Sequence, residues 1–347
     1  MTSSLPSRID THSHFLPPFY SEALANNGHK NPDGMPAIPP WSVDAHLEMM
    51  SLCNISKSIL SISSPGTYIV DDKDSLTRDL TRQCNAYAAG LKKTHPEKFG
   101  FWASLPLPHV ENALEEIDEA IRGDCDGFGL LTNYRGEYIG SAAFDPVFDK
   151  LNDVGATVFI HPTKPCVKCG NGASVDATPF GNQYPIPMFE FFFDTARAVI
   201  NLFSSGTVAR CPNITFIVPH SGGCMPPLFS RFTAFSHVIP GGTRLEPNDI
   251  RRQIRDQFYF DLAGFVFDGD TGGSGQLKAF VTGYDISYQT LLYGSDFPFT
   301  PVQFVKQFAD RMKDGLEDLF NDKERGDIYE GNAVKLLEKG RQKRSRL

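Results

Sequence analysis

The chain has 347 residues, of which 41% are hydrophobic and 21% are charged, proportions typical of a globular protein. Its formal net charge of −8 disfavours nucleic-acid and membrane partners, because anionic surfaces require a concentrated positive patch. No segment approaches the roughly 18 apolar residues of a membrane span, and the first residues lack the apolar run of a secretory signal. We therefore expect an intracellular, cytoplasmic protein whose one basic run, residues 339–346, is a solvated and frayed terminus.

Seven cysteines in a chain without a secretory signal indicate reduced thiols. Cys166 and Cys169 form a CxxC pair, but a zinc ribbon needs a second such pair, so we expect a loop without its own metal. The last three residues, Ser345, Arg346 and Leu347, are similar to the peroxisomal address Ser-Lys-Leu and leave a peroxisomal location open.

Strand-like and helix-like segments alternate along the whole chain. We expect eight strands, at residues 8–12, 57–62, 99–104, 127–130, 157–161, 214–219, 258–262 and 290–293. Helical periodicity falls between them at residues 76–91, 110–121 and 144–154, and again after a phenylalanine run at 189–193. This alternation of short apolar strands with helices predicts an α/β protein, a parallel (β/α)8 TIM barrel. A doubly wound open sheet is the alternative, disfavoured because reactive residues follow many strands instead of one crevice.

We expect a single domain over residues 1–347, without internal repeats or a linker. Two irregular stretches rich in Pro and Gly, around residues 26–40 and 164–187, are loop insertions of the kind that often form lids or binding loops. The glycine-rich segment 269–275 does not match the GxGxxG spacing, so it predicts a flexible loop and not a dinucleotide site.

His12 and His14 are the strongest chemical signal in the chain. In an extended segment, residues i and i+2 point to the same face, so the two imidazoles leave the first strand together. Such a pair can close on one divalent metal, and the alternative is a solvated pair near a flexible terminus.

More reactive side chains follow later strands, where a parallel barrel opens on a single face. His161 and Asp296 each end an apolar strand, and with His12 and His14 they make a set of three nitrogens and one oxygen that suits zinc, with manganese or another divalent ion as alternatives. His220 would lie beside the open position as an acid or base. Asp261 also ends a strand but is the weakest candidate.

Five short motifs follow one another in order, at residues 9–14 (IDTHSH), 159–162 (FIHP), 219–223 (PHSGG), 293–298 (YGSDFP) and 331–333 (GNA). Together they resemble the amidohydrolase superfamily, and specifically the decarboxylase branch that includes aminocarboxymuconate-semialdehyde decarboxylase. Within that branch the sequence most resembles the fungal 6-methylsalicylate decarboxylases of polyketide pathways. The resemblance implies a metal-binding barrel, a homodimer, the four metal ligands named above and a catalytic role for His220.

Three further positions are candidates for the substrate site, two of them through this resemblance. The branch has an arginine that grips a substrate carboxylate, and His46 stands in its place here, which argues against a dicarboxylate substrate. Arg231 matches a second arginine that reaches into the neighbouring subunit, although a surface cation is an equally good interpretation. Phe297, beside Asp296, is the third candidate, and with Phe299 it forms an apolar flank that would favour a raised pKa of Asp296. No lysine ends the fourth strand, where hydrolases of the superfamily carry a bridging lysine, so we expect one metal.

These features predict a metal-dependent, non-oxidative decarboxylase of an ortho-hydroxybenzoate, converting 6-methylsalicylate to 3-methylphenol and carbon dioxide. Asp296 is the candidate proton donor, assisted by His220. A metal-dependent hydrolase of a lactone or amide is the alternative enzyme, and a non-enzymatic barrel is disfavoured because all four ligand positions are filled.

Overall fold

The computed structural model describes residues 5–170, 173–238, 240, 244–265, 267 and 273–344. Within these residues, eight parallel strands form one sheet in the order β1-β2-β3-β4-β7-β10-β11-β12. They are β1 (Arg8–His14), β2 (Ile55–Ser61), β3 (Phe99–Ser104), β4 (Gly127–Leu131), β7 (Thr157–His161), β10 (Thr215–Val218), β11 (Phe258–Asp261) and β12 (Leu291–Leu292). The predicted strands are confirmed, with ends that shift by at most two residues.

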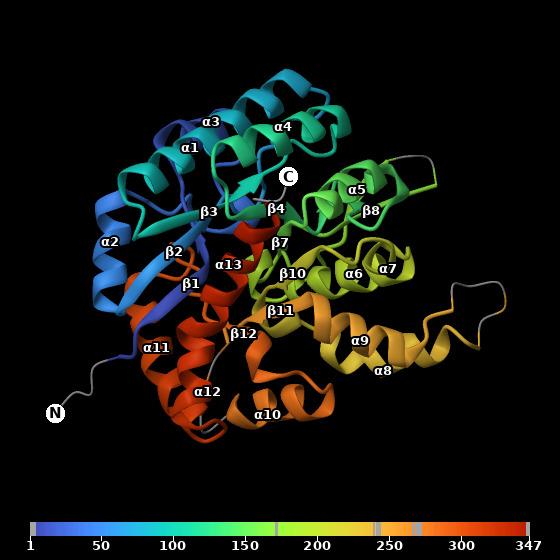
Figure 1. Cartoon of the computed structure of the whole chain (residues 1–347). Coiled ribbons are helices and arrows are strands. Elements are labelled where there is room, and N and C mark those ends of the chain that lie inside the picture. The colour runs from blue at the N-terminus through green and yellow to red at the C-terminus, as the bar shows by residue number, and fades with distance from the viewer. Residues whose placement is uncertain are drawn as a thin grey trace.

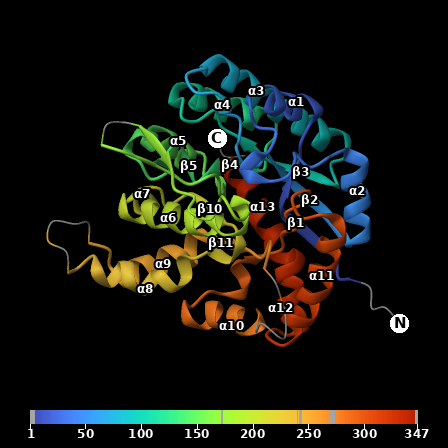
Figure 2. The same ribbon diagram turned by 180° about the vertical axis from the view of Figure 1, so that it is seen from behind.

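The sheet closes because the segment around β12 returns to β1. The amide of Thr11 donates to the Tyr293 carbonyl at 3.0 Å, and the amide of Asp296 donates to the His12 carbonyl at 2.8 Å. Figures 1 and 2 show the strands at the centre of the molecule with helices around them. The predicted TIM barrel is therefore confirmed.

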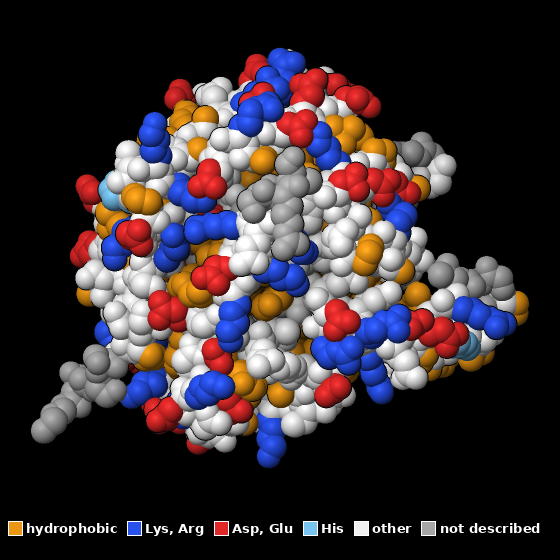
Figure 3. All heavy atoms as spheres, in the orientation of Figure 1, with side chains coloured by type: hydrophobic (Ala, Val, Ile, Leu, Met, Phe, Trp, Pro, Cys, Tyr) orange, Lys and Arg blue, Asp and Glu red, His pale blue; other side chains and the backbone are white. Residues whose placement is uncertain are grey.

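The helices described by the structure begin and end as follows: α1 (Pro18–Asn26), α2 (Val43–Leu52), α3 (Asp74–Thr94), α4 (Val110–Arg122), α5 (Asp145–Asp153), α6 (Glu190–Ser204), α7 (Thr207–Arg210), α8 (Met225–Phe235), α9 (Pro247–Gln257), α10 (Gly273–Gly283), α11 (Val302–Glu317), α12 (Asp322–Gly326) and α13 (Asn332–Arg344). None of them combines the length and apolar character of a membrane span. Figure 3 shows acidic and basic side chains interspersed over one face.

Two apolar layers hold the barrel together. The larger lies between the strands and the surrounding helices, and the smaller fills the barrel interior with Ile9, Trp102, Phe159 and other side chains. Leu336 of α13 joins the interior layer, so this helix packs against the barrel core. Burial of this kind is worth about 25 cal/mol per Å² of apolar surface, so both layers stabilise the barrel.

Three sequence-based expectations were wrong in detail. The basic run was expected to fray, but α13 continues to Arg344, and the Lys343 ammonium donates to the Asn213 carbonyl at 2.6 Å. The phenylalanine run does not precede a helix, because α6 begins at Glu190 and contains most of it. The glycine-rich segment was expected to be a loop, but Gly273 begins α10, and residues 269–272 lie outside the described residues. The terminal tripeptide 345–347 also lies outside them.

The two irregular stretches follow β1 and β7, so both lie at the face where the strands end. The first contains a single 3₁₀ turn (Pro32–Gly34), and the second contains the hairpin of β8 (Cys166–Lys168) and β9 (Ser174–Asp176). The loops meet, since a Cβ added at Gly34 would lie 3.7 Å from the Cα of Pro185. Another short hairpin, β5 (Asn133–Tyr134) with β6 (Glu137–Tyr138), follows β4.

Candidate metal centre

The barrel brings His12, His14, His161 and Asp296 together at the ends of β1, β7 and β12. One potential ligand atom from each of the four residues lies within 4.8 Å of the others. Three of the four side chains are buried, and Asp296 is 23% exposed. Closure between the first and last strands creates this cluster. Asp296 is 284 residues from His12 in the sequence, yet its backbone amide donates a hydrogen bond to the His12 carbonyl.

A buried carboxylate fixes the seam between β1 and the segment after β12. Asp10 accepts the amide of His12 at 3.2 Å, and it also accepts the amide and hydroxyl of Ser295 at 3.0 and 2.6 Å. Burial raises the pKa of Asp10 to about 7, despite these hydrogen bonds. Pairing of β1 with β2 shifts register between Asp10 and Ser13, in the part of the strand that carries His12.

Each imidazole is anchored through its Nδ1 atom. The Nδ1 of His12 lies 3.0 Å from the Asp261 carboxylate, and that of His161 lies 2.7 Å from the Pro162 carbonyl. The Nδ1 of His14 lies 2.9 Å from the Ser61 hydroxyl, which itself donates to the Ser13 carbonyl. Since these oxygens act as acceptors, each ring in its neutral form would carry its proton on Nδ1 and present the Nε2 lone pair.

This donor set fits a divalent cation. The Nε2 atoms of His12 and His14 are buried without a hydrogen-bond partner, and both face Asp296, at 3.6 and 3.2 Å. Buried lone pairs that converge with a carboxylate would be costly without a cation. Imidazole nitrogens and carboxylate oxygens are ligands that zinc and related divalent ions prefer.

The charges in the centre are strongly coupled. Burial alone would raise the pKa of Asp296, but the imidazoles of His14, His220 and His12 outweigh it and hold that pKa well below its usual range. Burial opposes protonation of His12, yet the Asp261 carboxylate raises its pKa to about 9. Burial and the neighbouring imidazoles lower the pKa of His161 and His14. The carboxylate is therefore anionic and ready to bind a cation.

Asp261 was the weakest candidate from the sequence, and the structure places it behind the cluster. Besides contacting His12, its carboxylate accepts the amides of His220 at 3.1 Å and Ala263 at 3.0 Å. It is fully buried. Such a carboxylate orients a metal-binding histidine and raises its basicity. Its position at the end of a strand was a usable signal, but its partners were not visible from the sequence.

His220 lies beside the cluster on a strained turn after β10. His220 and Ser221 both have positive φ, 53° and 54°. The Nε2 of His220 is 4.0 Å from Asp296, and its buried Nδ1 has no hydrogen-bond partner. A Cβ added at Gly264 would lie 3.3 Å from the His220 ring, so the glycine gives this ring its space. Strain of this kind is typical of functional positions.

An apolar cavity of about 640 Å³ opens beside His220. Its wall includes Phe192, Pro226, Phe265 and Phe280. The ring of Phe192 lies 5.2 Å from that of His220. The sequence assigned no role to these side chains, because four separate segments supply them: α6, α8, the residues after β11, and α10.

The predicted substrate residues lie at different depths. His46 is fully buried, accepts a hydrogen bond from the Trp41 indole at 3.1 Å, and packs edge-on against Phe297 with ring centres 5.2 Å apart. Burial lowers its pKa to about 3, so the ring is neutral. Phe297 is 7% exposed, so its ring is buried beside His46. Arg231 is exposed on α8, with its guanidinium 4.3 Å from the centre of the Phe235 ring.

Comparison with known proteins identifies the family to which this chain belongs. The amidohydrolase family model matches residues 9–339. The chain is 35% identical over 337 residues to the decarboxylase yanB of Aspergillus niger, covering 95% of this chain and 87% of the relative. It is 32% identical over 322 residues to the 6-methylsalicylic acid decarboxylase acuB of Aspergillus aculeatus, covering 89% and 92%.

Among solved structures, a dihydroxybenzoic acid decarboxylase of Polaromonas sp. JS666 with bound manganese superposes with a TM-score of 0.77 at 19% identity. The match covers 96% of this chain and 97% of that one. At this identity the likeness shows the fold.

The chain belongs to the amidohydrolase family. Within it, the chain is a carbon–carbon lyase, a decarboxylase.

Proposed function

We propose that this enzyme removes the carboxyl group of an ortho-hydroxybenzoate, and that its substrate is 6-methylsalicylate, converted to 3-methylphenol and carbon dioxide in fungal polyketide secondary metabolism. The convergence of His12, His14, His161 and Asp296, with His220 alongside, carries the proposal. The 32% identity to a 6-methylsalicylic acid decarboxylase supports the choice of substrate.

We assign one divalent ion, zinc or manganese, to these four residues. When bound, it supplies the positive charge that attracts and orients the carboxylate and phenolic oxygens of the substrate. The apolar cavity beside His220 offers room for the aromatic ring and its methyl group. His46 would position the ring of Phe297, against which it packs. A neutral His46 in place of an arginine suits a substrate with a single carboxylate.

Asp296 and His220 handle the proton. We propose that the anionic Asp296 first takes up a proton from His220, 4.0 Å away, and then delivers it to the ring carbon that bears the carboxylate. The bond between this carbon and the carboxylate then breaks and carbon dioxide leaves. The electron pair of the broken bond stays with the ring and restores its aromaticity. Acid catalysis of this kind contributes about 10²–10⁴-fold.

Turnover of 6-methylsalicylate in D₂O tests the reaction directly. We expect 3-methylphenol with one deuterium at the carbon that lost the carboxylate, together with one carbon dioxide per turnover. Asp296→Asn should abolish turnover, and His220→Asn should lower kcat by about 10²–10⁴-fold. Full turnover by Asp296→Asn would remove that residue from the proton step. Hydrolysis of lactones or amides without release of carbon dioxide would instead favour the hydrolase alternative.

We also propose a homodimer in which Arg231 reaches the neighbouring site. Exposed apolar side chains accompany Arg231 on this segment, with Leu228, Phe235 and Val238 exposed by 39%, 45% and 69%. Such a surface is typical of an interface. Mixing Arg231→Ala with Asp296→Asn subunits should restore activity, because each mixed dimer contains one intact site. No recovery in confirmed mixed dimers would contradict the shared site.

A further inference from the structure

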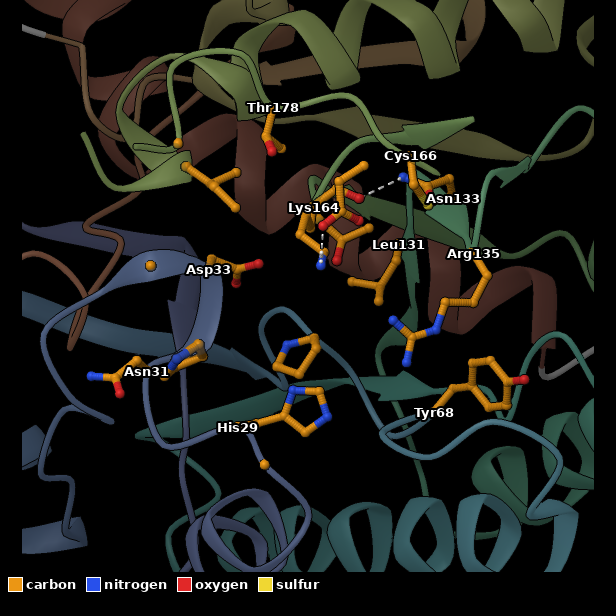
Figure 4. Close-up of a pocket in the computed structure, with 18 of the residues that line it drawn as sticks. His29, Asn31, Asp33, Tyr68, Leu131, Asn133, Arg135, Lys164, Cys166 and Thr178 are labelled. Carbon is orange, nitrogen blue, oxygen red and sulfur yellow. Dashed lines mark hydrogen bonds and ion pairs between the residues drawn. The ribbon is translucent and has the colours of Figure 1, made fainter. Parts of the chain in front are cut away.

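A second cavity lies between the two long loops at the face where the strands end. It measures about 440 Å³, and we call it the loop pocket; its lining includes His29, Asp33, Tyr68, Leu131, Arg135 and Lys164. Figure 4 shows the Arg135 guanidinium, the Lys164 ammonium and the Asp33 carboxylate turned toward the same space from three segments of the chain. Neither the proposed metal centre nor the proton step uses these side chains.

Arg135 occupies a backbone position that disfavours it. With Gly136 it forms the two-residue turn between β5 and β6, and both residues have positive φ, 52° and 82°. Turns of this type prefer asparagine, aspartate or glycine, whereas a long side chain in the left-handed region costs about 1 kcal/mol. A Cβ at Gly136 would lie 3.0 Å from the Lys168 amide, so the β8–β9 hairpin packs over this turn. The strain indicates that the arginine is present for its guanidinium.

Each cation in the pocket has a weakly held acidic partner. Arg135 pairs with Asp71 at 2.8 Å, with exposed fractions of 39% and 60%, and Lys164 pairs with Asp176 at 2.9 Å, with 37% and 57%. Exposed pairs of this kind contribute about 0–1 kcal/mol, so an incoming anion can displace the acidic partner. The Tyr68 ring lies 5.8 Å from the Arg135 guanidinium and adds an aromatic surface beside it.

The pocket adjoins the metal centre through a thin partition. Leu131 and Tyr134 line both the loop pocket and a much smaller cavity, of about 20 Å³, whose wall includes His161. A Cβ added at Gly66 would lie 2.7 Å from the end of the Leu131 side chain, so this side chain fills the gap between the cavities. A ligand held in the loop pocket is therefore one side chain away from a metal-binding residue.

We propose that the loop pocket captures aromatic carboxylate anions at the barrel mouth, with Arg135 and Lys164 binding the carboxylate and Tyr68 flanking the ring. The proposal rests on the proposed function only in taking the substrate to be an aromatic carboxylate. Asp33 faces the same space and opposes the anion. Capture at a charged site raises the rate of productive encounter, so it acts on kcat/KM and weakens with salt.

Arg135→Asn and Asp71→Asn form the decisive pair of variants. Asparagine suits the left-handed turn, so Arg135→Asn should raise Tm while lowering kcat/KM for 6-methylsalicylate about fivefold, with kcat little changed. Asp71→Asn frees the guanidinium and should raise kcat/KM about twofold. A guanidinium that only braces the loop through its ion pair predicts the same direction of change for both variants, and that result would overturn the proposal.

Charge-matched controls separate local capture from net charge. Arg252→Gln removes one positive charge from an exposed pair on α9, with Asp249 at 2.8 Å, and should leave kcat/KM near the wild-type value. Lys164→Gln should behave like Arg135→Asn, and Asp33→Asn should raise kcat/KM. Sodium chloride at about 0.5 M should shrink these differences, because it screens charges beyond a few ångströms. Equal effects of Arg252→Gln and Arg135→Asn would also overturn the proposal.

Equilibrium dialysis with salicylate distinguishes the failure of this proposal from that of the proposed function. If the protein releases no carbon dioxide but Arg135→Asn still weakens salicylate binding, capture stands and the reaction fails. If turnover is normal and both kcat/KM and salicylate binding are unchanged in Arg135→Asn and Lys164→Gln, the reaction stands and capture fails.

Discussion

The metal centre and the loop pocket lie on the same face of the barrel but are built in opposite ways. In the metal centre, each histidine is buried and anchored by a second polar group such as Asp261 or Ser61. In the loop pocket, Arg135 and Lys164 are each more than a third exposed and are held by surface ion pairs. The imidazoles are thus held in place by buried hydrogen bonds, whereas the cations at the mouth of the barrel can exchange their ion-pair partners.

The largest effect should come from removing a histidine of the metal centre. His161→Ala deletes one of the three nitrogen donors, so we expect metal loss and a fall in turnover of about 10³-fold or more. Elemental analysis and the carbon dioxide assay would measure both. His29→Ala removes an imidazole from the loop pocket instead and should keep the metal. Equal metal content in the two variants would contradict the assignment of His161 as a metal ligand.

Asp261 should matter less than a ligand but more than any side chain of the loop pocket. Asp261→Asn keeps the size of the side chain but removes the charge that orients His12. Loss of such an outer carboxylate typically costs about 10–100-fold in metal affinity or activity. Titration with a competing chelator would measure the affinity. An unchanged metal affinity would mean that Asp261 serves only the turn that holds His220.

The sequence was sufficient to predict the barrel and the cluster because both follow from short-range patterns. Apolar strands alternate with helices, and the reactive residue at the end of each strand must meet the others when a parallel barrel closes. His12, His14, His161 and Asp296 could therefore be grouped without knowing any contact. Whether these residues bind the metal and move the proton stays a prediction.

The remaining features depend on contacts between distant segments. Asp261 gained its importance only from the amides and the imidazole that it reaches across the barrel. The basic run was expected to fray because its charges suggested solvent, yet Lys343 finds a carbonyl after α7. Arg135 gave no signal, since its turn geometry depends on a hairpin of four paired residues. Two loops far apart in sequence jointly form the pocket that it faces.

The partition between the two regions can be tested with a pair of glycines. Gly66→Ala should destabilise the protein by about 1–3 kcal/mol and lower kcat/KM, because the new Cβ would press on Leu131 from a position with φ of 77°. Gly28→Ala provides the control, since its φ is 89° but nothing lies within 4 Å of the added Cβ. The difference between the variants isolates the steric effect on Leu131. Identical kinetics would show that the partition does not affect substrate access.

The smallest effect concerns Asp33, whose carboxylate faces the loop pocket. Burial raises its pKa to about 6 from 3.8. Because the folded-state pKa lies above the unfolded value, protonated Asp33 favours the folded protein. This contribution is fully present below pH 3.8 and is lost as the pH rises through about 6. Asp33→Asn should therefore gain in relative Tm between pH 4 and pH 7.

Because Asp33 lines an open pocket, solvent limits the change to about 1 kcal/mol, or about 2 °C in Tm. Asparagine tolerates the φ of 53° at this position, so the substitution changes the charge without adding backbone strain. Thermal melts of both proteins across this pH range would measure the difference. A difference in Tm that does not change with pH would show that Asp33 is as well solvated in the folded protein as in the unfolded chain. The loop pocket would then be still more accessible to water than the metal centre.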